Sequence, residues 1–136
     1  MKTPITVRFS DIDMAGHVHN SNYLSYFEQA RIDFLTAITG PNWNWKKRGL
    51  LIGRIEVDYI LPLYLRDKVY IKTCCDHVGN KSFTLSYELF KEVDGKTLLC
   101  TKGRSILICM DFLEEKSVPI FKEWKNDLMT SISSIN

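Results

Sequence analysis

The segment Val7–Leu35 constrains the fold most, because its apolar pattern changes from that of a strand to that of a helix. Val7 and Phe9 alternate with polar neighbours, which is typical of a half-buried strand. From Tyr23 onward apolar residues recur at helical spacing, at Tyr23, Tyr26, Phe27, Ala30, Phe34, Ala37 and Ile38. Leu24 and Ile32 widen this apolar face. The segment predicts a strand, a polar turn and a long helix buried on most sides.

Acid and base groups lie between the predicted strand and helix, at Asp11, Asp13, His17 and His19. Residues 20–22, Asn-Ser-Asn, suit the N-cap of the helix, because short polar side chains accept hydrogen bonds from its first N–H groups. The unpaired N–H groups of a helix start favour a developing anion. A carboxylate beside them is what acyl-transfer chemistry needs, because the carboxylate attacks or activates water while the N–H groups hold the oxyanion.

Residues 11–23 read DIDMAGHVHNSNY, and YFEQAR follows at residues 26–31. This run matches the pattern DxDxxGHVxNxxY, and it resembles the 4-hydroxybenzoyl-CoA thioesterase family of hotdog-fold proteins. The resemblance implies that Asp13 is the catalytic carboxylate and that the amide polarising the thioester carbonyl lies near His19–Asn20. Plant acyl-ACP thioesterases are similar here, but Ala15 stands where they have Asn.

Further roles follow from the same comparison. His17 is expected to orient the loop or the attacking water, and His19 to line the thioester pocket. Asn20 belongs to the expected oxyanion hole. Tyr23 is expected in the core with its hydroxyl near the site. Asp11 is expected to be a turn or surface residue.

Glu28 is the alternative catalytic acid, because a second hotdog thioesterase subgroup carries its acid on the central helix. The favoured interpretation is an ion pair between Glu28 and Arg31 at i,i+3. Lys81 and Arg104 are candidates for contacts with CoA phosphates, although solvated side chains of these types are commoner. The basic and aromatic run Asn42–Arg48 is another candidate for contacts with CoA. The favoured interpretation is a solvated loop whose tryptophans pack on the body of the protein.

Two Asp and two His within nine positions also form a possible divalent-metal site. The 4-hydroxybenzoyl-CoA thioesterase family, which this sequence resembles, works without metal. No cofactor is therefore expected beyond the CoA of the substrate. Cysteines stand at 74, 75, 100 and 109, without the C-x-x-C spacing of a zinc or redox site. They are expected to be buried free thiols, which fits a reducing cytoplasm.

The remainder of the chain predicts four strands in a meander and a short amphipathic helix after Pro119. The strands are expected at Leu51–Leu61, Val69–Val78, Phe83–Leu89 and Thr97–Phe112. Gly103 in the last of them indicates the close approach of a neighbouring backbone or a ligand. An antiparallel sheet with one apolar face needs a cover, which the long helix supplies, so the class is α+β.

The resemblance adds an architecture to this class. It implies one hotdog domain over residues 1–136, with a five- to six-stranded antiparallel sheet around the helix. It also implies a homodimer, often paired into tetramers, with active sites at the subunit interface.

Length and charge restrict the function. The 136 residues suit one domain, and a formal net charge of +2 does not favour nucleic acid. The sequence shows no apolar run long enough to span a bilayer and no signal peptide. Three hypotheses remain: an acyl-CoA thioesterase, an acyl-ACP thioesterase, and a non-hydrolytic acyl-CoA-binding or dehydratase-type hotdog module.

Overall fold

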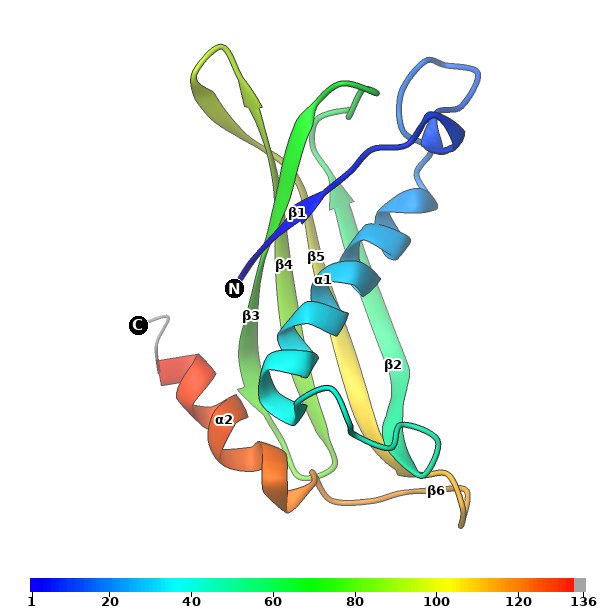
Figure 1. The fold of residues 1–136 in the computed structure, drawn as a ribbon, viewed down its shortest axis with the longest axis vertical. Coiled ribbons are helices and arrows are strands. Elements are labelled where there is room, and N and C mark those ends of the chain that lie inside the picture. The colour runs from blue at the N-terminus through cyan, green and yellow to red at the C-terminus, as the bar shows by residue number, and fades with distance from the viewer. Residues whose placement is uncertain (134–136) are drawn as a thin grey trace.

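A computed structural model describes residues 1–133, in which one antiparallel sheet lies against a long helix (Figure 1). Residues 134–136 of the predicted domain lie outside the described residues. The helices are α1 (Asn22–Thr39) and α2 (Lys122–Ser133), with a short 3₁₀ turn, η1, at Phe9–Asp11. The strands are β1 (Lys2–Ile5), β2 (Arg48–Tyr59), β3 (Lys68–Val78), β4 (Ser82–Val93), β5 (Lys96–Asp111) and β6 (Lys116–Ser117).

The strands follow the order β1-β3-β4-β5-β2, and β6 pairs with β5. The predicted meander is confirmed for β3, β4 and β5. It is wrong for β2, which pairs with β5 and forms one edge of the sheet. Residues 60–67 join β2 to β3 without a tight hairpin, and Leu63 buries its side chain completely within them. The connection is therefore a packed crossover that frees β2 to lie at the far edge.

The first strand lies earlier than its pattern predicted. It spans Lys2–Ile5 and pairs with β3, whereas Phe9 lies in η1 and is 83% exposed. The prediction of a strand through Val7 and Phe9 is wrong because Asp11 closes a local turn. The backbone N–H of Arg8 donates to the Asp11 carboxylate at 3.0 Å, so the chain folds back there and leaves the sheet.

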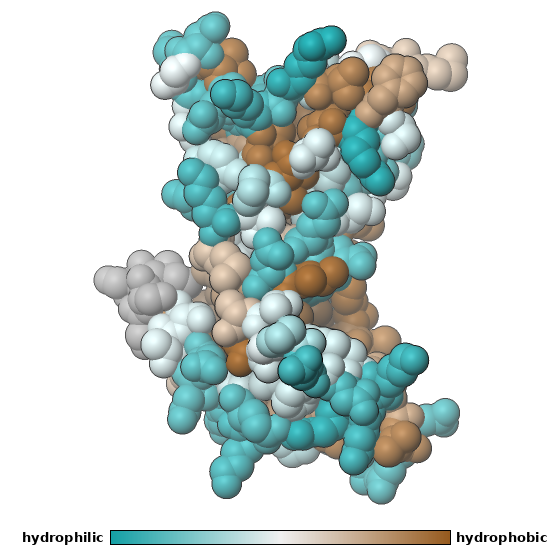
Figure 2. Space-filling model, viewed as in Figure 1, coloured by the Kyte–Doolittle hydropathy of each residue, from teal (hydrophilic) through white to brown (hydrophobic). Residues whose placement is uncertain are grey.

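The long helix begins after Ser21, one of the predicted N-cap residues, but it is buried on one face only. Gly40 adopts φ 75° directly after α1, the left-handed conformation that favours glycine at a helix end. The predicted burial on most sides is wrong, because Leu24 and Ile32 expose 40% and 54% of their surface. Figure 2 shows hydrophobic residues at the surface along the side of the molecule on which β2 lies. The face of α1 that carries Leu24 and Ile32 is therefore not covered by any other part of residues 1–133.

The loop at residues 42–48 packs its first tryptophan as predicted. The ring of Trp43 lies 4.9 Å from that of Trp124 in α2. The Arg48 guanidinium lies 4.6 Å from the ring of Phe121 and 2.7 Å from the Glu123 carboxylate. These contacts fasten the start of β2 to α2.

The four cysteines are free thiols, as predicted, and three of them are buried. Burial raises the pKa of Cys75 to about 11, so this thiol is protonated at neutral pH. Neither helix in residues 1–133 combines the length and the apolar character needed to cross a membrane.

The helix and the sheet approach each other closely at Gly103 in β5. A Cβ atom added there would lie 2.5 Å from Cε2 of Phe27, whose ring stacks on Tyr87 at 4.8 Å. The predicted close approach is therefore confirmed. The neighbour is an aromatic side chain rather than a backbone or a ligand, because the Phe27 ring occupies the space of the missing side chain.

We expect Gly103→Ala to lower the free energy of unfolding by about 1–3 kcal/mol, because the added methyl group displaces a packed ring. Chemical denaturation measures the change. Combining it with Phe27→Leu relieves the overlap, so the two substitutions together should cost less than the sum of their separate costs. Additive costs would contradict this explanation.

Candidate active site

The turn that holds Asp13 is closed by backbone hydrogen bonds. The N–H of Asp13 donates to the carbonyl of His17 at 3.0 Å, and the N–H of Gly16 donates to the carbonyl of Asp13 at 3.0 Å. Ile12 and Val18 form an isolated antiparallel bridge at its base. Gly16 adopts φ 86°, which other residues rarely accept. The turn is thus a small hairpin whose backbone fixes the Asp13 side chain.

The Asp13 carboxylate is half-buried and accepts one hydrogen bond, from the Ala15 N–H at 2.8 Å. It lines a cavity of about 500 Å³ between the turn, the start of α1 and the end of β2. The cavity is lined by Asp13, His17, Val18, His19, Asn20, Tyr23, Tyr59, Ile60, Leu61 and Pro62. The structure therefore brings together five predicted site residues from the turn and the helix start.

His19 is held beside the start of the helix by Ser21. Its Nδ1 accepts the Ser21 backbone N–H at 3.2 Å and lies 2.8 Å from the Ser21 hydroxyl. A backbone N–H can only donate, so Nδ1 carries no proton and the ring proton is on Nε2. His19 therefore presents its Nε2–H as a potential donor at the cavity that it lines.

The Asn20 backbone has one group in use and one free. Its carbonyl accepts a hydrogen bond from the Tyr59 hydroxyl at 2.8 Å, which ties the end of β2 to the start of α1. Its N–H makes no hydrogen bond within residues 1–133. This N–H is the kind of donor that an oxyanion requires.

Aromatic residues build the wall opposite the turn. The rings of Tyr23 and Tyr59 meet edge to face with centroids 5.1 Å apart, and Tyr23 is only 3% exposed. The prediction that Tyr23 is a core residue is confirmed. Burial raises the pKa of the Tyr59 hydroxyl, so it remains a donor at neutral pH. Tyr59 was not predicted as a site residue, because its alternation in β2 gave no sign of which helix end it would meet.

Asp11 is the residue that anchors the turn. Its side chain is only 2% exposed, and its carboxylate accepts the Tyr26 hydroxyl at 2.6 Å and the Arg8 guanidinium at 3.2 Å. The predicted turn role is correct, but the surface alternative is wrong. Burial alone would raise the pKa of Asp11, yet the hydrogen bonds from Tyr26 and Arg8 together hold it below its usual value.

The backbone of Asp11 connects the turn to the helix. Its carbonyl accepts the His19 N–H at 2.9 Å and the Asn22 side-chain amide at 3.0 Å. Asn22 therefore ties the first turn of α1 to Asp11, whereas the N-cap residue, Ser21, makes no side-chain cap bond. One residue thus sets the position of the turn and of the first turn of α1.

Glu28 lies away from Asp13, in a different cavity. It is exposed on α1 and lines a largely apolar cavity of about 610 Å³ between α1, β2 and β5. The predicted Glu28–Arg31 ion pair is wrong for the described residues, in which none forms. Arg31 is buried against the sheet instead, and its guanidinium donates to the Tyr87 hydroxyl at 3.4 Å.

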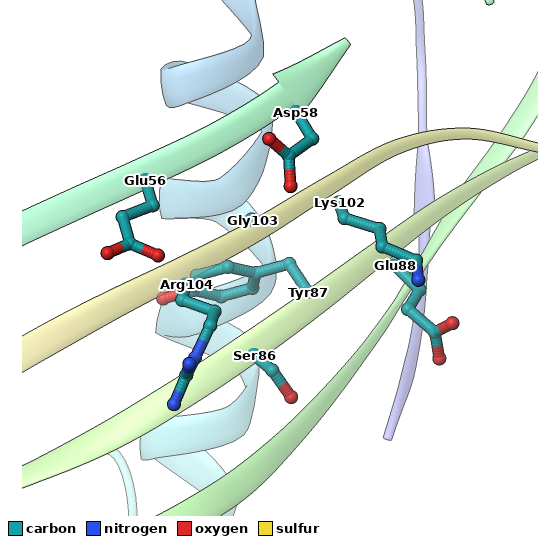
Figure 3. A pocket seen from close by; sticks show the side chains of 8 residues that line it. All are labelled: Glu56, Asp58, Ser86, Tyr87, Glu88, Lys102, Gly103 and Arg104. Atoms are coloured by element: carbon teal, nitrogen blue, oxygen red, sulfur yellow. The ribbon is translucent and has the colours of Figure 1, made fainter. Parts of the chain in front are cut away.

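The two predicted phosphate-binding residues also lie outside the Asp13 cavity of their own chain. Arg104 is on the outer face of the sheet, 3.5 Å from the Asp76 carboxylate, in a hollow of about 230 Å³ (Figure 3). Cross-strand neighbours alternate in charge there, with Arg104 beside Glu56 and Lys102 beside Asp58. Lys81 is exposed in the turn between β3 and β4.

The predicted metal alternative finds no convergent ligand set. Within residues 1–133, no three His, Cys, Asp or Glu side chains gather closely enough to hold a metal ion. Asp11, one of its four proposed ligands, uses its carboxylate for Tyr26 and Arg8 instead.

Comparison with known proteins agrees with this fold. Residues 7–128 match the Thioesterase-like superfamily. The chain is 26% identical to the long-chain acyl-CoA thioesterase FadM of Escherichia coli K12 over 129 residues, which cover 94% of this chain and 96% of that protein.

Solved structures share the architecture. A thioesterase from Thermus thermophilus, complexed with coenzyme A and Zn, superposes with a TM-score of 0.80 and 28% identity, covering 93% of this chain and 95% of that one. A 4-hydroxybenzoyl CoA thioesterase mutant complexed with 4-hydroxybenzoyl CoA superposes with a TM-score of 0.85. At 18% identity, over 93% of this chain and 96% of that one, the second match shows the fold alone.

We expect Tyr26→Phe to lower the free energy of unfolding by about 1.5–3 kcal/mol, because it removes a hydrogen bond to a buried carboxylate. Tyr64→Phe is the matched control, since that residue is 47% exposed. Equal free energies of unfolding for the two variants at pH 7 would contradict the role of Asp11 as an anchor.

The lowered pKa of Asp11 also predicts a pH dependence of stability. The ionised carboxylate stabilises the fold at pH values above its usual pKa of 3.8, and this stabilisation is lost as the pH falls through the lowered pKa.

Proposed function

Because this chain belongs to the thioesterase-like superfamily, we propose that it hydrolyses an acyl-CoA thioester to a free acid and CoA. The observation that carries the proposal is the half-buried carboxylate of Asp13, which shares a cavity with the free N–H of Asn20 at the start of α1. Thioester hydrolysis needs a carboxylate on one side of the carbonyl and an oxyanion donor on the other. The named acyl-CoA thioesterase relative supports the same substrate class.

Two routes are open to Asp13. As a nucleophile, its oxygen attacks the carbonyl carbon, the C–S bond breaks with CoA leaving as thiolate, and water then hydrolyses the anhydride. As a general base, it takes a proton from water while that water attacks the carbonyl carbon, and the proton finally reaches the thiolate. In both routes the carbonyl oxygen becomes negative, and the Asn20 N–H and the helix start stabilise it.

The histidines complete the proposed site. His19 offers Nε2–H as a second donor at the cavity, since Ser21 holds its Nδ1. The His17 ring lies edge-on to Tyr64 with centroids 6.5 Å apart, which fixes it on the side of the β2–β3 connection. We assign His17 to orienting the turn and the attacking water.

We also propose that hydrolysis requires no resident metal ion. The Asp13 carboxylate is already oriented by the Ala15 N–H, and the chemistry above is complete without a Lewis acid. Activity should survive exhaustive chelation. Loss of activity that a divalent ion restores would contradict this assignment.

We propose further that two copies associate through β2. This twelve-residue edge strand exposes Leu51 and Ile52 to about half of their surface. Long unpaired edges invite pairing with another chain, and a twofold axis pairs an edge with itself and leaves neither edge open. The exposed side of α1, with Ile32, would be covered by the same contact.

A cytoplasmic site of action fits the four free cysteines.

We expect Asp13→Asn to lower kcat for acyl-CoA hydrolysis at least about a hundredfold, because an amide neither attacks a carbonyl nor takes a proton from water. The assay follows release of the CoA thiol, so a protein that only binds acyl-CoA would give no signal. KM and the melting temperature should change little, because the substitution keeps the size of the side chain.

Glu28→Gln is the matched carboxylate control. It lies in the other cavity and should retain most of the turnover. Loss of activity in Glu28→Gln together with near-normal turnover in Asp13→Asn would transfer the catalytic role to the helix acid.

We expect light scattering to give at least twice the chain mass of 15.8 kDa at micromolar concentration. Ile52→Arg should shift the protein towards the monomer, because it places a charge on the face that the second copy covers. Lys125→Glu on the exposed face of α2 is the surface control. A monomeric wild-type protein would contradict the proposed association.

A further inference from the structure

Ser21 stands at the N-cap position of α1 but does not cap the helix. The sequence predicts a capping role for residues 20–22, yet the Ser21 side chain makes no cap hydrogen bond. An N-cap side chain usually accepts from the N–H of the second or third helical residue. The second is Tyr23, and its N–H makes no hydrogen bond within residues 1–133. The Ser21 hydroxyl therefore serves something other than the helix start.

The hydroxyl is used on the imidazole ring of His19. Oγ of Ser21 lies 2.8 Å from Nδ1 of His19, and the Ser21 backbone N–H donates to the same nitrogen at 3.2 Å. Because the N–H can only donate, Nδ1 is an acceptor, and the hydroxyl is the donor in the shorter contact. Both polar hydrogens of Ser21 are thus directed at one ring nitrogen.

The backbone of His19 is fixed by separate hydrogen bonds. Its N–H donates to the Asp11 carbonyl at 2.9 Å, and its carbonyl accepts the Asn22 N–H at 3.0 Å. These bonds leave the side-chain torsions of His19 free. Within residues 1–133 the ring has no other hydrogen-bond partner than Ser21 and no aromatic contact. The backbone therefore places His19, and Ser21 orients its ring.

We propose that Ser21 is a positioning residue of the active site and acts through His19. His19 lines the Asp13 cavity beside Asn20, whose N–H is free. With Nδ1 held by Ser21, the ring offers Nε2–H to the thioester carbonyl oxygen as a second donor next to the Asn20 N–H. A donor that is oriented before the substrate arrives stabilises the oxyanion without a reorganisation cost. This inference rests on the proposed function.

The first test compares Ser21→Ala with Ser25→Ala, the same substitution at an exposed serine of α1 that does not line the cavity. We expect Ser21→Ala to lower kcat for acyl-CoA hydrolysis about three- to tenfold, as for the loss of one neutral hydrogen bond. KM should stay the same, because the donor acts on charge that develops only in the transition state. Ser21→Thr keeps the hydroxyl and should restore kcat. An unchanged kcat in Ser21→Ala would overturn the inference.

Thermal unfolding of the same variants distinguishes positioning from capping. A serine that caps a helix stabilises it, so its replacement by alanine destabilises the protein. Ser21 makes no cap bond, and we expect Ser21→Ala to melt at the same temperature as Ser25→Ala. A clearly lower melting temperature for Ser21→Ala would make this serine a cap and would contradict the assignment.

A double-mutant cycle tests whether Ser21 acts through His19. His19→Ala keeps the backbone bonds to Asp11 and Asn22 and should lower kcat about tenfold or more, as for the loss of an oxyanion donor. In that background Ser21→Ala should change kcat less than about twofold, because the ring that it orients is gone. An equal loss in both backgrounds, or a wild-type kcat in His19→Ala, would overturn the inference.

Nitrogen-15 NMR of the histidine rings reads the tautomer directly. His19→Ala identifies the His19 signals among those of the three histidines. At a pH at which the ring is neutral, wild-type His19 should carry its proton on Nε2, and Ser21→Ala should raise the share of rings protonated on Nδ1. A wild-type ring protonated on Nδ1 would exclude the proposed orientation.

These measurements separate the inference from the proposed function. Wild-type protein that hydrolyses no acyl-CoA defeats the proposed function, whatever the tautomer of His19. Wild-type hydrolysis that depends on Asp13 but not on Ser21 defeats the inference alone.

Discussion

The hydrogen bond from Tyr26 to Asp11, 2.6 Å long and buried, is the contact on which the candidate site depends. Tyr26 belongs to the packed face of α1, so it fixes Asp11 relative to the core. Asp11 in turn holds the His19 N–H and the Asn22 side chain through its carbonyl. Asp13 follows two residues later in a closed turn, so the contacts of Asp11 also fix the position of the Asp13 carboxylate. A buried carboxylate is tolerated because Tyr26 and Arg8 satisfy it.

The edge strand β2 connects the candidate site with the proposed association. Its end at Tyr59 closes the cavity and binds the Asn20 carbonyl, while its outer edge remains unpaired in the single chain. The proposed twofold contact would therefore lie beside the same cavity that this strand helps to form.

The sequence predicted the parts of the structure that depend on local patterns. The helical spacing from Tyr23 onward located α1, and alternation located β3, β4 and β5. Long-range pairing was not predictable in this way, so β2 was assigned to the wrong neighbour. In the site, the motif residues Asp13, His17, His19, Asn20 and Tyr23 line one cavity. The burial of Asp11 was missed because its partner lies 15 residues away, although a tyrosine on an apolar helix face needs a hydrogen-bond partner.

Amide hydrogen exchange with a thioether analogue of acyl-CoA, which cannot be hydrolysed, tests the central claim most directly. If the Asp13 cavity binds the reacting group, the analogue should slow exchange at residues 13–24 and 59–62. Slowed exchange only around Glu28–Thr36, beside the second cavity, would contradict the account and place the reaction on the other side of α1.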